Sequence, residues 1–188
     1  MIALCPGFAP VARAATPPAR IWYRDGALPE LALPDGGHET VRSMLDIGRS
    51  MRFGDFAWDE KDIPAGRLWI FIDLPRQILS VFGDGHEIGT AVILYGTDGK
   101  PTPSGRFAVL EKREDYFSRS YRAPMPYMLR LTRDGVAIHG SQVLRGRATH
   151  GCIGIPVDFA RLVFAAAGKG DQVVIVPAPT VPEKTVAR

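Results

Sequence analysis

Apolar stretches separated by tight turns fill the middle of the chain and restrict the folds that it can adopt. Residues 68–74, 77–82 and 87–95 are stretches of this kind, and Gly83-Asp84-Gly85 separates the last two. Apolar runs of this length bounded by Gly and Asp are typical of hairpins in an antiparallel sheet. Further strands are expected at 106–112, 127–132, 136–139 and 173–176. The sequence therefore predicts a mainly β fold.

Two segments show the spacing of an amphipathic helix. Apolar residues recur every three or four positions from Phe159 to Ala166, and Gly168 would end this helix. The apolar residues of 41–48 follow the same spacing, with Thr40 in the N-cap position. We therefore expect one helix near each end of the domain.

The N-terminal 66 residues are expected to extend the main domain. Met1 to Ala15 is interpreted as a degraded or truncated signal segment, because Ala12-Arg13-Ala14 suits a cleavage site while a basic start is missing. Residues 16–37 are rich in proline and predict an extended arm that is anchored by Ile21-Trp22-Tyr23. An arm and a helix are thus expected over 16–66.

Composition excludes two classes of protein. The chain has 23 basic and 20 acidic residues and a net charge of +3, which is too small to indicate nucleic-acid binding. Its uninterrupted apolar runs are far shorter than 18 residues, so the printed sequence predicts no transmembrane segment. We expect one globular domain over 67–177 and a disordered tail at 178–188.

The stretch from Ile138 to Pro156 carries the residues for thiol chemistry. Cys152 directly follows His150-Gly151, and His139 ends an apolar run. A free thiol with a pKa of about 8.5 is only about 3% ionised at pH 7, and an imidazolium that lowers this pKa by about two units would make it mostly thiolate. His139 is the better candidate base, because a strand end holds a ring more rigidly than a loop does. His150 is expected to shape the loop.

At these residues the chain resembles a known family. His139-Gly140 followed by Thr149-His150-Gly151-Cys152 is similar to the signature of the L,D-transpeptidase (YkuD) catalytic domain. The likeness extends over about residues 67–177, through similar stretches at 102–107 and 123–128. It implies an L,D-transpeptidase-like β-sandwich with one or two helices, here extended by the N-terminal arm and helix.

The resemblance also implies roles for individual residues. Cys152 would be the nucleophile and His139 its general base, while the carbonyl of Gly140 would orient the imidazole. The backbone amides of Gly151 and Cys152 would form the oxyanion hole that stabilises a tetrahedral intermediate.

Six residues are candidate substrate contacts: Met125, Tyr127, Arg147, Thr149, His150 and Gly154. Met125 and Tyr127 belong to the aromatic-rich residues of the segment at 114–126 and its end, which predicts either a flap over the substrate or a loop packed for stability. Arg147 precedes the nucleophile and would either attract carboxylates or remain solvated. Gly154 stands where the family usually has Arg or Asn, which predicts a wider cleft and an altered substrate preference.

The implied reaction is acyl transfer between peptidoglycan stem peptides through a thioester on Cys152. It would take place in the periplasm or at the cell wall, and carbapenem-type β-lactams would inhibit it. An L,D-carboxypeptidase or amidase would use the same residues with water as acceptor, whereas a wall-binding module would need no catalysis. The chain has no Cys-x-x-Cys or His-x-x-x-His pair, so neither a metal nor an organic cofactor is expected.

Overall fold

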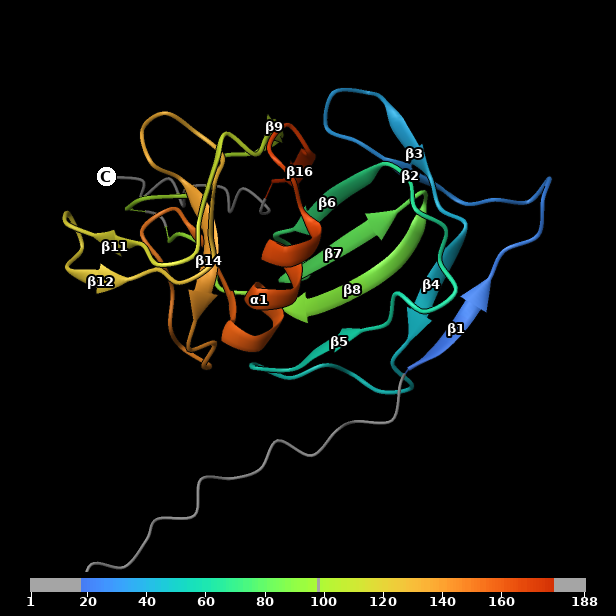
Figure 1. Cartoon of the computed structure of the whole chain (residues 1–188), viewed down its shortest axis with the longest axis horizontal. Coiled ribbons are helices and arrows are strands. Elements are labelled where there is room, and N and C mark those ends of the chain that lie inside the picture. The colour runs from blue at the N-terminus through green and yellow to red at the C-terminus, as the bar shows by residue number, and fades with distance from the viewer. Residues whose placement is uncertain (1–17, 98, 178–188) are drawn as a thin grey trace, which may run out of the picture.

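The computed structural model describes residues 18–97 and 99–177, which form two main β-sheets and one α-helix (Figure 1). The predicted signal segment and tail lie outside the described residues. The strands of the larger sheet are β1 (Ala19–Trp22), β4 (Ser43–Asp46), β5 (Phe56–Trp58), β6 (Leu68–Asp73), β7 (Ile78–Gly83), β8 (His86–Val92), β9 (Gly105–Ala108) and β16 (Gln172–Val176). Their order is β1-β4-β8-β7-β6-β16-β9, and β5 pairs with β8. The mainly β prediction is confirmed.

The smaller sheet carries the candidate site. Its strands are β10 (Glu111–Arg113), β13 (Met128–Arg130), β14 (Ala137–Ser141) and β15 (Ile153–Pro156), in that order. Two ribbons lie apart from both sheets: β2 (Glu30–Ala32) with β3 (His38–Thr40), and β11 (Phe117–Ser118) with β12 (Ala123–Pro124). The second ribbon projects beyond β14 at the edge of the molecule (Figure 1).

The main core lies where the two sheets face the helix α1 (Val157–Ala166). Ile70 and Val81 of the larger sheet and Ile138 of the smaller one belong to this core. Phe159 enters it from α1 and contacts Trp58, with ring centroids 5.9 Å apart. Packing this apolar stripe against both sheets stabilises α1, which follows a proline and has no side-chain N-cap bond. The predicted C-terminal helix is confirmed.

The predicted N-terminal helix is wrong. Residues 43–46 form β4, whose side chains alternate between buried Ser43 and Leu45 and the more exposed Met44 and Asp46. The backbone N–H of Leu45 donates to Glu87 Oε2 of β8 at 2.9 Å, and Ser43 pairs with His86. The neighbouring strand therefore decides the conformation of a segment whose spacing alone favours a helix.

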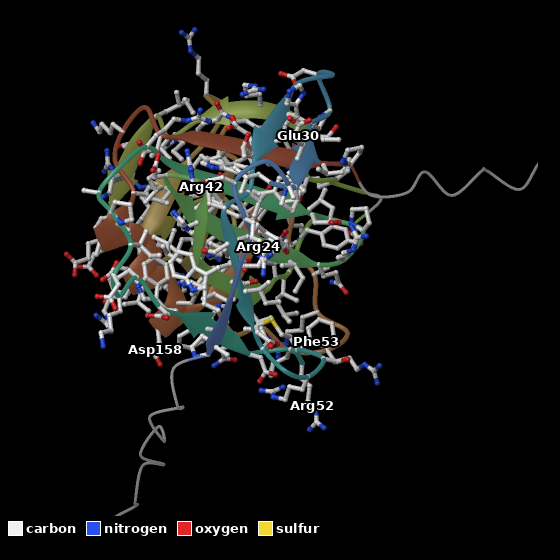
Figure 2. The ribbon with its side chains drawn as sticks, turned by 90° about the vertical axis from the view of Figure 1, so that its right-hand side faces the viewer. Arg24, Glu30, Arg42, Arg52, Phe53 and Asp158 are labelled. Atoms are coloured by element: carbon white, nitrogen blue, oxygen red, sulfur yellow. The ribbon has the colours of Figure 1, made fainter. Side chains whose placement is uncertain are left out.

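The three predicted anchors of the arm differ in burial. Tyr23 packs against a core cluster. Ile21 is 45% exposed and Trp22 57% exposed, although the Trp22 ring lies 5.3 Å from that of His86. The buried attachment is made by Arg20, whose guanidinium donates to Ser43 Oγ at 2.9 Å and to the carbonyl of Glu87 at 2.7 Å. Figure 2 views this side of the molecule, with Arg24 following β1.

Two strand boundaries differ from those expected. The β8 strand ends at Val92, and residues 94–96 cross toward the smaller sheet, where Leu94 pairs with Gly154. The predicted strand at 106–112 is divided between β9 of the larger sheet and β10 of the smaller one. Both departures join the two sheets close to the candidate site.

Candidate active site

Parallel pairing of β14 and β15 brings the two candidate catalytic side chains together. Ile138 pairs with Ile153 and His139 with Gly154, so the same register places Cys152 opposite Ala137. Side chains two residues apart on a strand share a face, and so do paired residues of parallel strands. His139 and Cys152 therefore face the same side of the sheet, and both line one cavity. His139 lies within β14 instead of at its end.

The imidazole of His139 is held in one tautomer. Its Nδ1 lies 2.9 Å from the carbonyl oxygen of Gly140. A carbonyl can only accept, so Nδ1 carries the proton and Nε2 of the neutral ring has a free lone pair. Burial lowers the pKa of His139, although the bond to Gly140 partly opposes this shift. The ring is thus a neutral base in the resting state.

The thiol of Cys152 is also neutral in the resting state. Its Sγ lies 3.8 Å from the carbonyl oxygen of Gly135, and its neighbours include Met125 and Met128. Burial raises the pKa of Cys152, with the carboxylate of Asp134 as a smaller cause, and a hydrogen bond with the Ala137 backbone opposes them. Burial disfavours both charges of the expected thiolate and imidazolium pair, so this structure favours the neutral thiol and the neutral imidazole.

Backbone contacts hold the nucleophile loop on both sides of Cys152. Before it, the N–H of Thr149 donates to the carbonyl of Tyr95 at 3.0 Å. After it, Leu94 and Gly154 exchange two hydrogen bonds of 2.8 and 2.9 Å. Gly96 permits this approach, because a Cβ there would lie 2.7 Å from the Gly151 nitrogen. Residues 94–96, which follow β8 of the larger sheet, therefore hold the segment 149–154 in place through these hydrogen bonds.

Thr102 orients the peptide that joins Gly151 to Cys152. Its buried hydroxyl accepts from the N–H of Gly96 at 2.9 Å and donates to the carbonyl of Gly151 at 3.0 Å. The carbonyl and the N–H of one trans peptide point in opposite directions, so Thr102 also sets the direction of the Cys152 N–H. In residues 18–97 and 99–177, the N–H groups of Gly151 and Cys152 donate no backbone hydrogen bond. They are available to an oxyanion.

Two cavities meet at Cys152. The first, of about 160 Å³, includes Met125, His139, Ser141 and Thr149 in its lining and is called the His139 cavity. The second, of about 300 Å³, includes Lys100, Asp134 and Gly135 and is called the Lys100 cavity. Three residues line both: Tyr121, His150 and Cys152. A substrate spanning both cavities would pass over the thiol.

Tyr121 and His150 form the wall between the two cavities. Their rings stack with centroids 4.8 Å apart, and Lys100 Nζ donates to the Tyr121 hydroxyl at 2.9 Å. Tyr121 lies in the turn between β11 and β12. The segment at 114–126 thus contributes to the walls of both cavities through its hairpin.

Comparison with known families decides which family the chain represents. A sequence model of the L,D-transpeptidase catalytic domain (YkuD) matches residues 67–175, which is more than half of the 188 residues. The chain belongs to this family. A comparison with curated protein sequences found no match.

Solved structures of L,D-transpeptidases share the fold. The enzyme from Stackebrandtia nassauensis is 21% identical with a TM-score of 0.57, over 62% of this chain and 58% of that one. A mutant of the Enterococcus faecium enzyme is 27% identical with a TM-score of 0.54, over 60% and 50% of the two chains. The enzyme LdtMt1 in complex with imipenem is 24% identical with a TM-score of 0.55, over 58% of each chain. This chain thus spans about half to three-fifths of their length.

The structure places three of the six predicted substrate contacts in the lining of a cavity at the thiol: Met125, Thr149 and His150. Tyr127 instead packs against Phe164 of α1, with ring centroids 5.8 Å apart. Arg147 is exposed and lines neither cavity. Tyr127 and Arg147 thus lie outside the linings of both cavities, and their contact with substrate stays a prediction.

Gly154 pairs with His139, but the missing side chain at this position leaves no empty volume beside the strand. It is buried in β15, and a Cβ there would meet Ser141 Cβ at 3.1 Å. Ser141 lines the His139 cavity and occupies the room that a larger residue at 154 would need. A side chain at 154 would therefore have to displace Ser141, and the wider cleft and altered substrate preference stay predictions.

Sequence reasoning did not identify Thr102, Lys100 and Asp134 as neighbours of the segment that carries Cys152. Thr102 lies in a stretch that resembles the family, yet its pattern indicates only a turn. Asp134 lies in the predicted hairpin turn between β13 and β14, and Lys100 follows β8. The described residues include no group of three or more His, Cys, Asp and Glu side chains placed to hold a metal ion. Nor do they include a helix long and apolar enough to cross a membrane.

Proposed function

We propose that this protein is an L,D-transpeptidase that transfers an acyl group between peptidoglycan stem peptides. The observation that carries the proposal is that Cys152 and His139 share one face of β14 and β15, at the point where two cavities meet. Membership of the L,D-transpeptidase family supports it. The named roles of Cys152, His139, Gly140 and Gly151 are part of this proposal.

Acylation begins with a neutral thiol and a neutral imidazole. As Sγ of Cys152 attacks the carbonyl carbon of a donor amide, its proton passes to Nε2 of His139. The Gly151 and Cys152 amides stabilise the oxyanion. The C–N bond then breaks, and the imidazolium gives its proton to the departing amine. The acyl group remains as a thioester, and the imidazole is neutral again.

Deacylation reverses these steps with a second amine. The acceptor amine attacks the thioester carbon and loses a proton to His139 as the new C–N bond forms. The C–S bond then breaks, and the thiolate recovers a proton from the imidazolium. If water replaces the amine, the same residues act as an L,D-carboxypeptidase or amidase. Product analysis distinguishes the two outcomes.

The proposed site of action is the periplasm or the cell wall, where stem peptides are found. Carbapenem-type β-lactams are the proposed inhibitors, because LdtMt1, which shares the fold, has been solved in complex with imipenem. Opening of the β-lactam ring by Cys152 would form a stable thioester. The structure supports this through the amides of Gly151 and Cys152 beside the thiol.

The test is to incubate purified protein with defined tetrapeptide stems and to identify products by mass spectrometry. Cross-linked stems and a mass adduct on Cys152 are expected, and Cys152→Ala should give neither. A carbapenem should add one equivalent to the wild type and none to the variant. Turnover that survives in Cys152→Ala would refute the mechanism. A wild type that binds wall fragments without any adduct would support a non-catalytic wall-binding module.

A further inference from the structure

A groove, here called the turn groove, lies between two tight turns and shares no lining residue with either cavity at the thiol. Its volume is about 560 Å³, and it is lined from two distant segments by Met51, Arg52, Phe53, Leu144 and Arg145. The N–H of Asp55 closes the first turn on the carbonyl of Arg52 at 2.9 Å. The N–H of Arg147 closes the second turn on the carbonyl of Leu144 at 3.2 Å. Figure 2 shows Arg52 and Phe53 together at one edge of the molecule.

The floor of the turn groove is apolar and is anchored in the protein. Met51 and Phe53 pack against a small core cluster that includes Val143. The next residue, Leu144, is 49% exposed, so it meets water at the second turn. An apolar surface of this kind gains free energy when a partner removes it from water. The floor therefore favours an occupant that has an apolar part.

The rim of the turn groove is basic. Arg52 and Arg145 line the groove, Arg147 ends the second turn, and all three are exposed. In the described part of the chain, none of these three guanidinium groups forms an ion pair. The neighbouring carboxylate of Asp55 already pairs with Arg49 at 2.6 Å. The rim therefore has an excess of positive charge and favours an anionic occupant.

The remaining residues of the printed sequence do not supply such an occupant. Residues 1–17 contain one basic residue, Arg13, and no acidic residue. Residues 178–188 contain Glu183 against Lys184 and Arg188. Neither segment brings the negative charge that the rim requires, so the occupant comes from outside the chain.

The lining side chains also distinguish a lipid from a peptide. The guanidinium groups of Arg52 and Arg145 can only donate hydrogen bonds, and the other lining side chains are apolar. A peptide brings backbone N–H donors, which these side chains would leave unpaired at a cost in free energy. A phospholipid brings phosphate oxygens that accept two parallel guanidinium N–H bonds, and acyl chains without polar groups.

We propose that the turn groove binds the surface of a membrane that contains anionic phospholipids. Arg52, Arg145 and Arg147 would bind phosphate groups, while Leu144 and the floor would contact the acyl chains near them. The second turn continues into the lining of the His139 cavity at residues 148–149. Membrane binding would therefore hold the active site close to the membrane, although it uses no residue of the proposed catalytic mechanism.

The test measures how the full-length protein partitions onto lipid vesicles in a sedimentation assay. One set of vesicles is phosphatidylcholine alone, and the other contains about one third phosphatidylglycerol. The wild type should bind the anionic vesicles at least about tenfold more tightly than the neutral ones, because each arginine near an anionic surface favours binding. High salt should weaken this binding, because it screens the charges. Free inorganic phosphate at the concentration of the lipid phosphate should not compete.

Variants of the rim and the floor should each weaken binding to the anionic vesicles. Arg52→Gln combined with Arg145→Gln should lower the partition coefficient about 20- to 30-fold, which is about fivefold for each arginine. Arg52→Lys combined with Arg145→Lys keeps both charges and should retain most of the binding. Leu144→Ser should lower the partition coefficient about fivefold, because it removes apolar contact with the acyl chains.

Matched controls change the same residue types elsewhere on the surface. Arg24 and Arg161 are exposed and outside the groove. Arg24→Gln combined with Arg161→Gln makes the same change in net charge and should stay within about threefold of the wild type. Leu110 is 45% exposed, and Leu110→Ser should bind like the wild type.

The outcomes that would overturn the inference are distinct from failure of the proposed function. Equal binding to both kinds of vesicle, equal losses in the rim variant and its control, or displacement by inorganic phosphate would each show that the groove is not a membrane site. Binding of an acidic peptide in place of vesicles would make it a peptide site, and the inference would be wrong. Cys152→Ala should bind vesicles like the wild type, so the result does not depend on catalysis.

Discussion

Two histidines, buried His86 and half-buried His139, lie in different regions of this molecule and have opposite hydrogen-bond surroundings. His86 belongs to the arm cluster, defined as Arg20, Ser43, His86 and Glu87, whereas His139 lies at the thiol. Burial is the main cause that lowers the pKa of both. Their difference therefore comes from the hydrogen-bond partners around them.

In the arm cluster, the polar groups satisfy each other's hydrogen-bonding needs. Ser43 Oγ receives a bond from Arg20 and lies 2.9 Å from Nδ1 of His86. The carboxylate of Glu87 accepts from Ser80 at 2.6 Å and from the Leu45 N–H at 2.9 Å. Such a network holds β1 and β4 against β8, and it leaves little polar capacity for a ligand.

Around the thiol, some hydrogen-bond donors and acceptors have no partner among the described residues. In the described part of the chain, the ring of His139 has one hydrogen bond, to the Gly140 carbonyl. The thiol of Cys152 has a long contact to the Gly135 carbonyl and a hydrogen bond with the Ala137 backbone. Among the described residues, Nε2 of His139 and the N–H groups of Gly151 and Cys152 have no hydrogen-bond partner. The arm cluster is thus a saturated hydrogen-bond network, whereas the groups at the proposed site keep hydrogen-bonding capacity.

The largest effect that tests this contrast is expected when the proposed base, His139, is removed. His139→Gln should reduce kcat/KM for Cys152 acylation by at least 10²-fold, because no group then takes the thiol proton. Acylation is measured by intact-protein mass spectrometry. The exposed His38→Gln is the matched control and should act like the wild type. If His150→Gln abolished acylation while His139→Gln retained it, His150 would be the base.

Removing Arg20, the central donor of the arm cluster, should reduce stability instead of activity. Arg20→Ala should lower the free energy of unfolding by about 3 kcal/mol, because it leaves Ser43 and the Glu87 carbonyl without their buried donor. Urea denaturation measures this change. Arg24→Ala, on the exposed side shown in Figure 2, should change stability by less than about 0.5 kcal/mol. An equal loss in both variants would show that the cluster has no special role.

A smaller effect on activity is expected at Thr102. Both hydrogen bonds of its hydroxyl are made within the protein, and they orient the peptide next to Cys152. Thr102→Val removes the hydroxyl that orients the Gly151 carbonyl. We expect kcat for acylation to fall about tenfold with little change in KM, because the oxyanion contact strengthens in the transition state. Thr102→Ser should restore most of the rate. A variant that changes only KM would argue for a direct substrate contact.

The smallest effect is the response of the wild type to pH. The pKa of His139 lies below its ordinary 6.5 and that of Cys152 above its ordinary 9.0. The reactive state has both groups neutral, so activity falls only when acid protonates the imidazole or base ionises the thiol. The profile of kcat/KM should therefore be flat from about pH 6.5 to 9. A steady rise across this range would show that the preformed thiolate reacts without His139.

The sequence by itself determined the β class and the C-terminal helix, and it supplied the thiol and the base that we propose. Strand lengths, Gly and Asp turns, and the His139-Gly140 and His150-Gly151-Cys152 steps are local signals, and they need no knowledge of distant neighbours. Gly151 is an example, because its φ of +99° suits glycine in the turn before the nucleophile.

Tertiary structure alone decided which neighbours these segments meet. Residues 43–46 have helical spacing but become a strand, because β8 supplies hydrogen-bond partners that their own turn could not. Thr102 is 49 residues from Gly151, and Lys100 and Asp134 are separated by more than thirty positions, yet all lie around one thiol. Spacing predicts which face of a strand a residue occupies, whereas contacts across such separations depend on how the two sheets close on each other.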